Sequence, residues 1–151
     1  MFKPNVTVAC LVVCDNSFVL VKEKDKQTGK TVFNQPAGHL EAHENLMQAC
    51  CRELFEETGL EFEPNSLLGI HLLEASNQTT YLRFSFLLEI PGTQKPHLFP
   101  QDREILSARW YSSEEIIALR SQLRSPMIEA DIESYRLGQR ADLALFKTYY
   151  A

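Results

Sequence analysis

The sequence predicts an α/β (α+β) fold in which one layer of β-sheet has helices packed against it. Three observations lead to this prediction. Apolar β-rich segments alternate with turn residues along most of the chain, one segment has helical apolar periodicity, and two helix-start patterns follow residue 111. The length of 151 residues fits one domain, and a hydrophobic content of 44% is enough to form a buried core. We therefore expect a single domain over residues 1–151.

The N-terminal region is predicted to begin with a β-hairpin. Residues 6–14 are apolar and β-rich, which indicates a buried strand, and Asp15-Asn16 is a turn signal that leads into a second strand over residues 17–21. The polar stretch 22–31 is expected to form a loop. A short strand over residues 32–35 follows and is expected to end at the next residue, a proline.

Residues 44–58 have the clearest helical pattern in the sequence. Four apolar residues stand at the spacing i, i+3, i+4, i+7 and form one stripe along such a helix: Met47, Cys50, Cys51 and Leu54. Gly59 follows at the position where a helix C′ residue is expected. The stripe predicts that this helix packs against the sheet.

The second half of the chain is predicted to add three strands, over residues 67–74, 79–90 and 105–111, and two helices, over residues 113–119 and 126–138. Side chains in the middle strand alternate between polar and apolar. Ser112 and Glu115 form a capping-box pattern, and Ser125-Pro126 has the residues typical of a helix N-terminus. Two helices are therefore expected after the last strand in the sequence.

The composition excludes several classes of function. The net charge is −5 with no block rich in Lys or Arg, whereas nucleic-acid-binding proteins carry a basic patch, so we expect no nucleic-acid partner. A small anionic substrate is compatible with this charge if a bound cation reverses it locally. The four cysteines include no CxxC pair and are expected to be reduced, buried thiols, as is typical of the cytosol. With no signal-peptide pattern and no long apolar run, we expect a cytoplasmic protein without membrane contact.

Three glutamates, Glu53, Glu56 and Glu57, lie close together near the end of the helix over residues 44–58. At about 100° per residue they occupy roughly one quadrant of the helix surface, where they repel one another and the negative end of the helix dipole. One interpretation is a solvated acidic face. The other is a site for Mg²⁺ or Mn²⁺, because these hard cations prefer carboxylate oxygens and bind substrate phosphates at the same time.

The spacing of the residues in this region resembles the complete Nudix signature. The matching residues are Gly38, Glu44, Arg52, Glu53, Leu54, Glu56, Glu57, Gly59 and Leu60. Ala37 and His43 stand where family members often have glycine, but neither is a fixed position of the signature. The resemblance implies a mixed β-sheet sandwiched between helices, and a hydrolase that directs water at the phosphorus of a diphosphate linkage.

The resemblance also implies a set of Mg²⁺ ligands, which consists of the carbonyl of Gly38 and the carboxylates of Glu53, Glu56 and Glu57. Arg52 is implied to orient these glutamates through charge-assisted hydrogen bonds, and Glu44 to fix the junction between loop and helix.

A glutamate outside the signature is implied to be the general base or an additional metal ligand, and Glu104 is the candidate for this role. The alternative for Glu104 is a solvated loop acid. Asp102 is a weaker candidate in the same loop, and Glu56 could itself be the base.

Four residues outside the helix are candidates for substrate binding: Phe33, Tyr81, Arg83 and Arg124. Arg83 stands on the polar side of its strand and could hold a phosphate, with an ordinary ion pair as the alternative. Phe33 and Tyr81 could stack on a base or pyrimidine ring, although core packing is the alternative for Phe33. Arg124 could reach an anionic substrate or remain solvated.

A less specific resemblance covers nearly the whole chain and points to one bacterial phosphatase of this family; the segments that carry it are residues 1–10, 34–42, 82–84, 123–126 and 138–140. It implies release of inorganic phosphate from hydroxymethylpyrimidine diphosphate, thiamine diphosphate and some nucleoside di- and triphosphates, with Mg²⁺. Two alternatives remain open, a hydrolase of another nucleotide (a dinucleoside polyphosphate or a damaged nucleoside triphosphate) and a non-catalytic nucleotide-sensing module. In each case the partner is a small phosphate-containing molecule, and the chain is expected to be a monomer or a small homo-oligomer.

Overall fold

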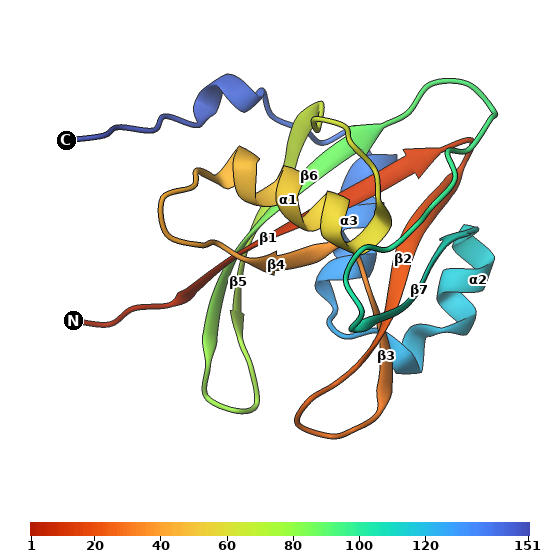
Figure 1. The fold of residues 1–151 in the computed structure, drawn as a ribbon, viewed down its shortest axis with the longest axis horizontal. Coiled ribbons are helices and arrows are strands. Elements are labelled where there is room, and N and C mark those ends of the chain that lie inside the picture. The colour runs from red at the N-terminus through yellow and green to blue at the C-terminus, as the bar shows by residue number, and fades with distance from the viewer.

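The computed structural model of the chain describes residues Met1–Ala151 and consists of a seven-stranded mixed sheet with three α-helices (Figure 1). The strands are β1 (Asn5–Cys14), β2 (Ser17–Lys24), β3 (Thr31–Asn34), β4 (Ala37–His39), β5 (Ser66–Glu74), β6 (Thr80–Glu89) and β7 (Ile105–Tyr111). The helices are α1 (Leu46–Thr58), α2 (Ser113–Ala118) and α3 (Met127–Arg136), with short 3₁₀ turns at Arg120–Gln122 and Leu143–Leu145. The predicted fold class is confirmed.

The sheet is organised around β1. This strand pairs in parallel with β6 along nearly its whole length, and β6 pairs antiparallel with β5 at the edge. On its other side β1 pairs with β4 near its start and with β2 at the hairpin turn. Strand β2 then diverges from β1 and pairs with β3 and β7. The sheet therefore has two branches, one formed by the strands around β1 (β4, β5 and β6) and one by the strands around β2 (β3 and β7). The chain between β3 and β4 crosses from the second branch to the first.

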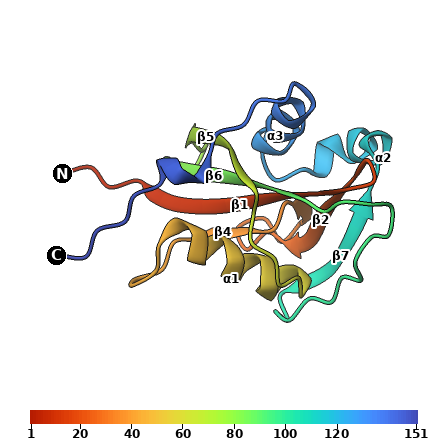
Figure 2. The same ribbon diagram turned by 90° about the horizontal axis from the view of Figure 1, so that it is seen from above.

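Helices cover both faces of the sheet, with α1 on one side and α2 and α3 on the other (Figure 2). The reason is visible in β1, whose side chains from Val8 to Cys14 are all buried, as expected for a central strand covered on both faces. Val8, Cys10 and Val12 pack in a core with Ala49, Cys50 and Leu54 of α1. Leu11 and Val13 point the other way and pack in a core with Ile116 of α2 and Ile128 and Ile132 of α3.

The boundaries of α1 are set by its two caps. Gly59 ends the helix in the left-handed conformation, at φ +76, as the sequence indicates. The helix begins at Leu46 rather than at Glu44, because Asn45 is the N-cap and forms a capping box with Gln48. The predicted capping box of Ser112 and Glu115 is present at the start of α2.

Two parts of the sheet differ from the sequence-based expectation. The polar residues 22–24, expected in a loop, lie in β2, because this strand has hydrogen-bonded neighbours on both sides. Strand β4 is not predicted, since three residues after a proline carry no periodic pattern. It forms because the carbonyl of Pro36 accepts from the N–H of Cys10 and so aligns the next residues with β1. No helix has the length and apolar character needed to cross a membrane.

Candidate metal and catalytic site

Two of the three glutamates of α1, Glu53 and Glu57, lie against β4, and the two elements form the centre of the candidate site. Because Gly38 of β4 has no side chain, the carboxylate of Glu53 lies directly over it, and a Cβ at position 38 would overlap that carboxylate. The side chain of Glu53 is 14% exposed. Burial raises the pKa of Glu53, and the neighbouring Arg52 guanidinium opposes the rise.

Glu57 is the most deeply buried of the three glutamates, at 6% exposure. Its Oε1 accepts a hydrogen bond of 2.7 Å from the backbone N–H of Ala37, the residue before Gly38. Burial raises the pKa of Glu57 to about 9, and this one hydrogen bond offsets only part of the effect. A positive charge beside Glu57 would favour its ionised form and lower this pKa.

Arg52 connects the loop before α1 to the acidic side of the helix. Its guanidinium donates to both carboxylate oxygens of Glu44, at 2.7 and 3.0 Å, and to the carbonyl of His39 at 2.9 Å. It also contacts Glu53 at 2.7 Å and Glu56 at 3.4 Å. These bonds lower the pKa of Glu44 and raise that of Arg52. Arg52 thus holds the loop and two of the three glutamates in one network.

The donor set suits a hard divalent cation, although no three acidic, histidine or cysteine side chains converge on one point in this structure. Glu53 and Glu56 are turned toward Arg52, and Glu57 is turned toward the Ala37 N–H. The fit rests on the chemistry of these groups. Two of the carboxyl groups, those of Glu53 and Glu57, have raised pKa values, and the backbone beside them at Gly38 has no Cβ to block access.

The loop before β7 is fastened to the C-terminal end of α1. The carbonyl of Glu56 accepts from the N–H groups of Gln101 and Asp102, at 2.9 and 2.8 Å. The charge of Asp102 contributes to the raised pKa of Glu57. Glu104, by contrast, has a 68% exposed side chain that pairs with Lys26 at 3.2 Å. The backbone of Asp102 is therefore bonded to the end of α1, whereas the Glu104 carboxylate lies in solvent beside Lys26.

Sequence reasoning missed two residues beside this site, Glu23 of β2 and Asn34 of β3. Burial raises the pKa of Glu23, while Arg124, at 3.0 Å, and Asn34 oppose the rise. The Oδ1 atom of Asn34 is buried without a hydrogen-bond partner. Glu23 falls in the stretch expected to be a loop, so the sequence carried no signal for its burial.

The four candidate substrate residues lie in different surroundings. Arg83 is 5% exposed, and burial lowers its pKa to about 10. Tyr81 is partly exposed and lies 6.4 Å from the His39 ring, measured between ring centroids. Arg124 is 41% exposed and pairs with Glu23. Phe33 is only 6% exposed and packs edge-on against Tyr111 in the core, so little of its ring is available for stacking.

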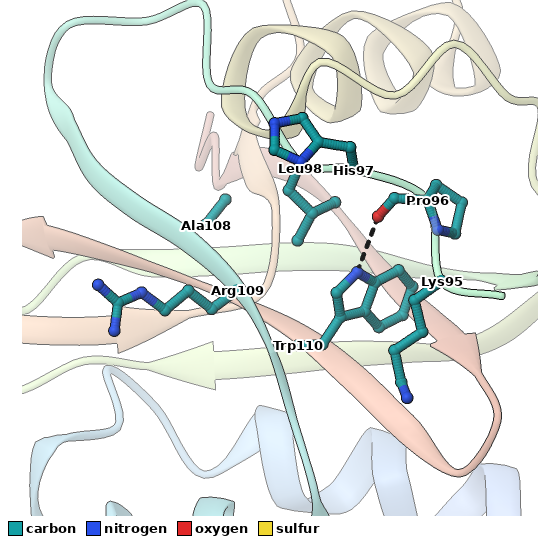
Figure 3. A pocket seen from close by; sticks show the side chains of 7 residues that line it. All are labelled: Lys95, Pro96, His97, Leu98, Ala108, Arg109 and Trp110. Atoms are coloured by element: carbon teal, nitrogen blue, oxygen red, sulfur yellow. Dashed lines mark hydrogen bonds between the residues drawn. The ribbon is translucent and has the colours of Figure 1, made fainter. Parts of the chain in front are cut away.

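An open cavity of about 410 Å³ lies between β7 and the loop that precedes it (Figure 3). Trp110 borders it and donates from Nε1 to the carbonyl of Pro96. The side chain of Arg109 points away from the Trp110 ring, as Figure 3 shows. None of the site residues expected from the sequence lines this cavity.

Known proteins resemble this chain both in sequence and in fold. A family model described as NUDIX domain matches residues 3–131. The phosphatase NudJ of Escherichia coli K12 is 44% identical over 145 residues, which is 96% of this chain and 92% of that protein. A NUDIX hydrolase from Nitrosomonas europaea has a TM-score of 0.87 and 41% identity, covering 97% of this chain and 98% of that one. A MutT protein from Methanosarcina mazei Go1, at 20% identity and a TM-score of 0.73 over 92% of this chain and 99% of that one, shares the fold.

Proposed function

The chain belongs to the Nudix hydrolase family and acts on phosphorus anhydrides, and from this premise we propose that it is a Mg²⁺-dependent phosphatase that releases inorganic phosphate from small diphosphates. We include hydroxymethylpyrimidine diphosphate, thiamine diphosphate and nucleoside di- and triphosphates among the substrates, and Mn²⁺ as a substitute metal. The observation that carries the proposal is the pair of glutamates, Glu57 buried and Glu53 largely buried, held against Ala37 and Gly38 of β4. The phosphatase NudJ, 44% identical to this chain, supports the choice of reaction.

In this proposal the metal ligands are the Gly38 carbonyl and the carboxylates of Glu53, Glu56 and Glu57. A bound divalent cation would neutralise the phosphate oxygens and lower the pKa of a water molecule. Arg52 and Glu44 support the site, because their hydrogen bonds join the approach loop to the helix. Arg52 is also bonded to Glu44 and to the His39 carbonyl, and these bonds would hold it in place if the glutamates bound a cation.

The proton of the attacking water needs an acceptor near the buried glutamates. Asp102 is favoured by position, since its backbone N–H is bonded to the Glu56 carbonyl and its charge acts on Glu57. Glu104 is the second candidate, and its carboxylate would first have to leave Lys26. Glu56, 42% exposed, is the third.

For substrate binding we propose Arg124 and Tyr81 as direct contacts, because both are accessible. Arg124 would exchange its ion pair with Glu23 for a substrate anion. The burial of Arg83 and Phe33 leaves them an indirect part, in which they support the residues that touch the substrate.

A product-resolved substrate panel with Mg²⁺ tests the proposal. Purified enzyme is offered thiamine diphosphate, hydroxymethylpyrimidine diphosphate, nucleoside di- and triphosphates, a dinucleoside polyphosphate and an oxidised nucleoside triphosphate, and phosphate and pyrophosphate are measured separately. We expect inorganic phosphate from the first three groups. Pyrophosphate as the sole product, or turnover of only the last two compounds, would favour another nucleotide hydrolase. Binding without turnover of any compound would favour a sensing module.

A further inference from the structure

A chain of four buried or half-buried polar side chains lies on the face of the sheet opposite α1. His71 of β5 contacts Asp131 of α3, with 2.7 Å between Nε2 and Oδ1. The other carboxylate oxygen of Asp131 accepts from Nε2 of Gln35 at 3.0 Å. Oε1 of Gln35 in turn accepts from the guanidinium of Arg83 on β6. The chain thus joins three elements to the segment between β3 and β4.

Gln35 is the neutral link between two buried charges. Asp131 and Gln35 are both fully buried, and Arg83 is 5% exposed. The amide of Gln35 donates to the carboxylate of Asp131 through its nitrogen and accepts from the guanidinium of Arg83 through its oxygen. Gln35 is also the only side chain that accepts from Arg83, whose Nε has no partner. A buried charge that loses its partner is strongly destabilising. Turning the Gln35 side chain would leave both Asp131 and Arg83 without this partner, so its orientation is tightly fixed.

The backbone next to Gln35 carries the contacts to the metal site. Two residues further on, the N–H of Ala37 donates to Glu57 on the α1 side of the sheet. The following residue, Gly38, lies against the carboxylate of Glu53. The polar chain therefore holds residue 35 on the face of the sheet opposite α1, and residues 37 and 38 contact Glu57 and Glu53 on the α1 face.

We infer that Gln35 and Asp131 are positioning residues, which set the place of the Ala37 N–H and the Gly38 backbone relative to Glu53 and Glu57. This inference rests on the proposed metal-dependent function. A network that served stability alone would leave the metal site unaffected when it was changed, provided that the protein stayed folded. A positioning network has to change metal affinity and the mobility of the 35–38 backbone.

The test uses a pair of substitutions that exchange the roles of the two residues. Gln35→Glu places two carboxylates face to face, and Asp131→Asn places two amides face to face. The double variant again has one carboxylate and one amide, with their positions exchanged. The carboxylate at position 35 would pair with Arg83, and the amide at position 131 would donate to that carboxylate. Glu129→Gln is the matched control, because Glu129 lies on the same helix but pairs with Arg120 outside this network.

Two measurements on the full chain separate positioning from stability: calorimetric titration with Mn²⁺ alone, and the hydrogen-exchange rate of the Ala37 amide in metal-free protein. We expect Gln35→Glu to weaken Mn²⁺ binding by about 10- to 100-fold and to speed the exchange, and the double variant to recover both. Asp131→Asn gives a smaller loss in the same direction and serves if Gln35→Glu does not fold. The inference is overturned if the single variants melt earlier yet bind Mn²⁺ like the native chain. If the native chain itself binds no Mn²⁺ or Mg²⁺, the proposed function fails and this inference fails with it.

Discussion

Gly38 shows how one missing side chain makes room for a functional group. The Glu53 carboxylate occupies the volume that a Cβ at this position would need. Because Glu53 is also bonded to Arg52, it cannot turn away without breaking that network. The requirement for glycine at position 38 is one of space alone, whereas Gly59 combines a positive φ angle with a close approach to the Phe99 carbonyl oxygen, which would lie 2.5 Å from an added Cβ.

We predict that Gly38→Ala lowers kcat/KM by at least about 100-fold, since the added methyl displaces a metal ligand, and that it destabilises the fold by about 1–3 kcal/mol through overpacking. Phosphate release and urea unfolding measure the two effects. Gly29→Ala is the control: it faces open space at φ +70 and should affect stability alone. Native activity in Gly38→Ala would contradict the contact with Glu53.

Glu57→Gln should separate activity from stability. The amide oxygen can still accept from Ala37, while the cost of burying an acidic group, which shows as its raised pKa, is removed, so the metal-free protein should be equally stable or more stable by about 1–2 kcal/mol. Turnover should fall by at least about 100-fold, because a neutral amide is a poor ligand for a hard cation. Melting in EDTA and a phosphate assay with Mg²⁺ give the comparison. Unchanged turnover in this variant and in Glu53→Gln would mean that the helix does not carry the metal chemistry.

At the scale of elements, the junction between β4 and α1 depends on the bonds between Glu44 and Arg52. Arg52 lowers the pKa of Glu44 in the folded chain. The stabilisation is therefore complete above the unfolded-state pKa of about 4.3 and is lost as the pH falls through the lower folded-state value. We predict that Glu44→Gln costs about 1–2 kcal/mol at pH 7 and progressively less below pH ~4. Urea unfolding of both proteins from pH 3 to 7 checks this, and a constant difference across that range would contradict the ion pair.

The loop between β6 and β7 gives a second element-scale prediction. The backbone of Asp102 is held by α1, whereas Glu104 is paired with Lys26 in solvent. Asp102→Asn should therefore lower kcat by at least about 10-fold with little change in KM, and Glu104→Gln by less than about 3-fold. The two substitutions are controls for each other, since each removes one charge from the same loop. The opposite order of effects would assign the proton acceptor to Glu104.

Sequence patterns predicted the elements wherever local physics decides the structure. The apolar stripe from Met47 to Leu54 and the glycine at 59 indicated α1, and the capping box of Ser112 indicated α2. Strand β4 could not be predicted, because its only cause is pairing with β1, which is distant in sequence. The same holds for the burial of Glu23 and Gln35, which depends on strands and a helix that meet them only in the folded chain.

At the scale of the whole molecule, the site joins α1 to both branches of the sheet. Glu57 bonds to β4, and the loop after β6 bonds to the end of α1. Ligands that bind only this assembled form raise its stability by mass action, by about 2.7 kcal/mol at a concentration of 100 times Kd. We predict that Mg²⁺ raises the melting temperature in a concentration-dependent way and that EDTA reverses the shift and abolishes turnover. Glu57→Gln is the control and should show little shift; a native melting temperature independent of Mg²⁺ and Mn²⁺ would argue against a metal site.

The parallel pairing of β1 with β6 also has a consequence for how the chain folds. It joins residues 5–13 to residues 81–89, which lie 76 positions apart in the sequence. The apolar surface that receives α1 includes Phe86 and Leu88 of β6, so the helix can form early but has no complete partner until β6 arrives. Contacts of such long range slow folding, because the loop between them must close before they form. During synthesis, the helix that carries the glutamates therefore lacks part of its packing surface until about residue 90 has left the ribosome.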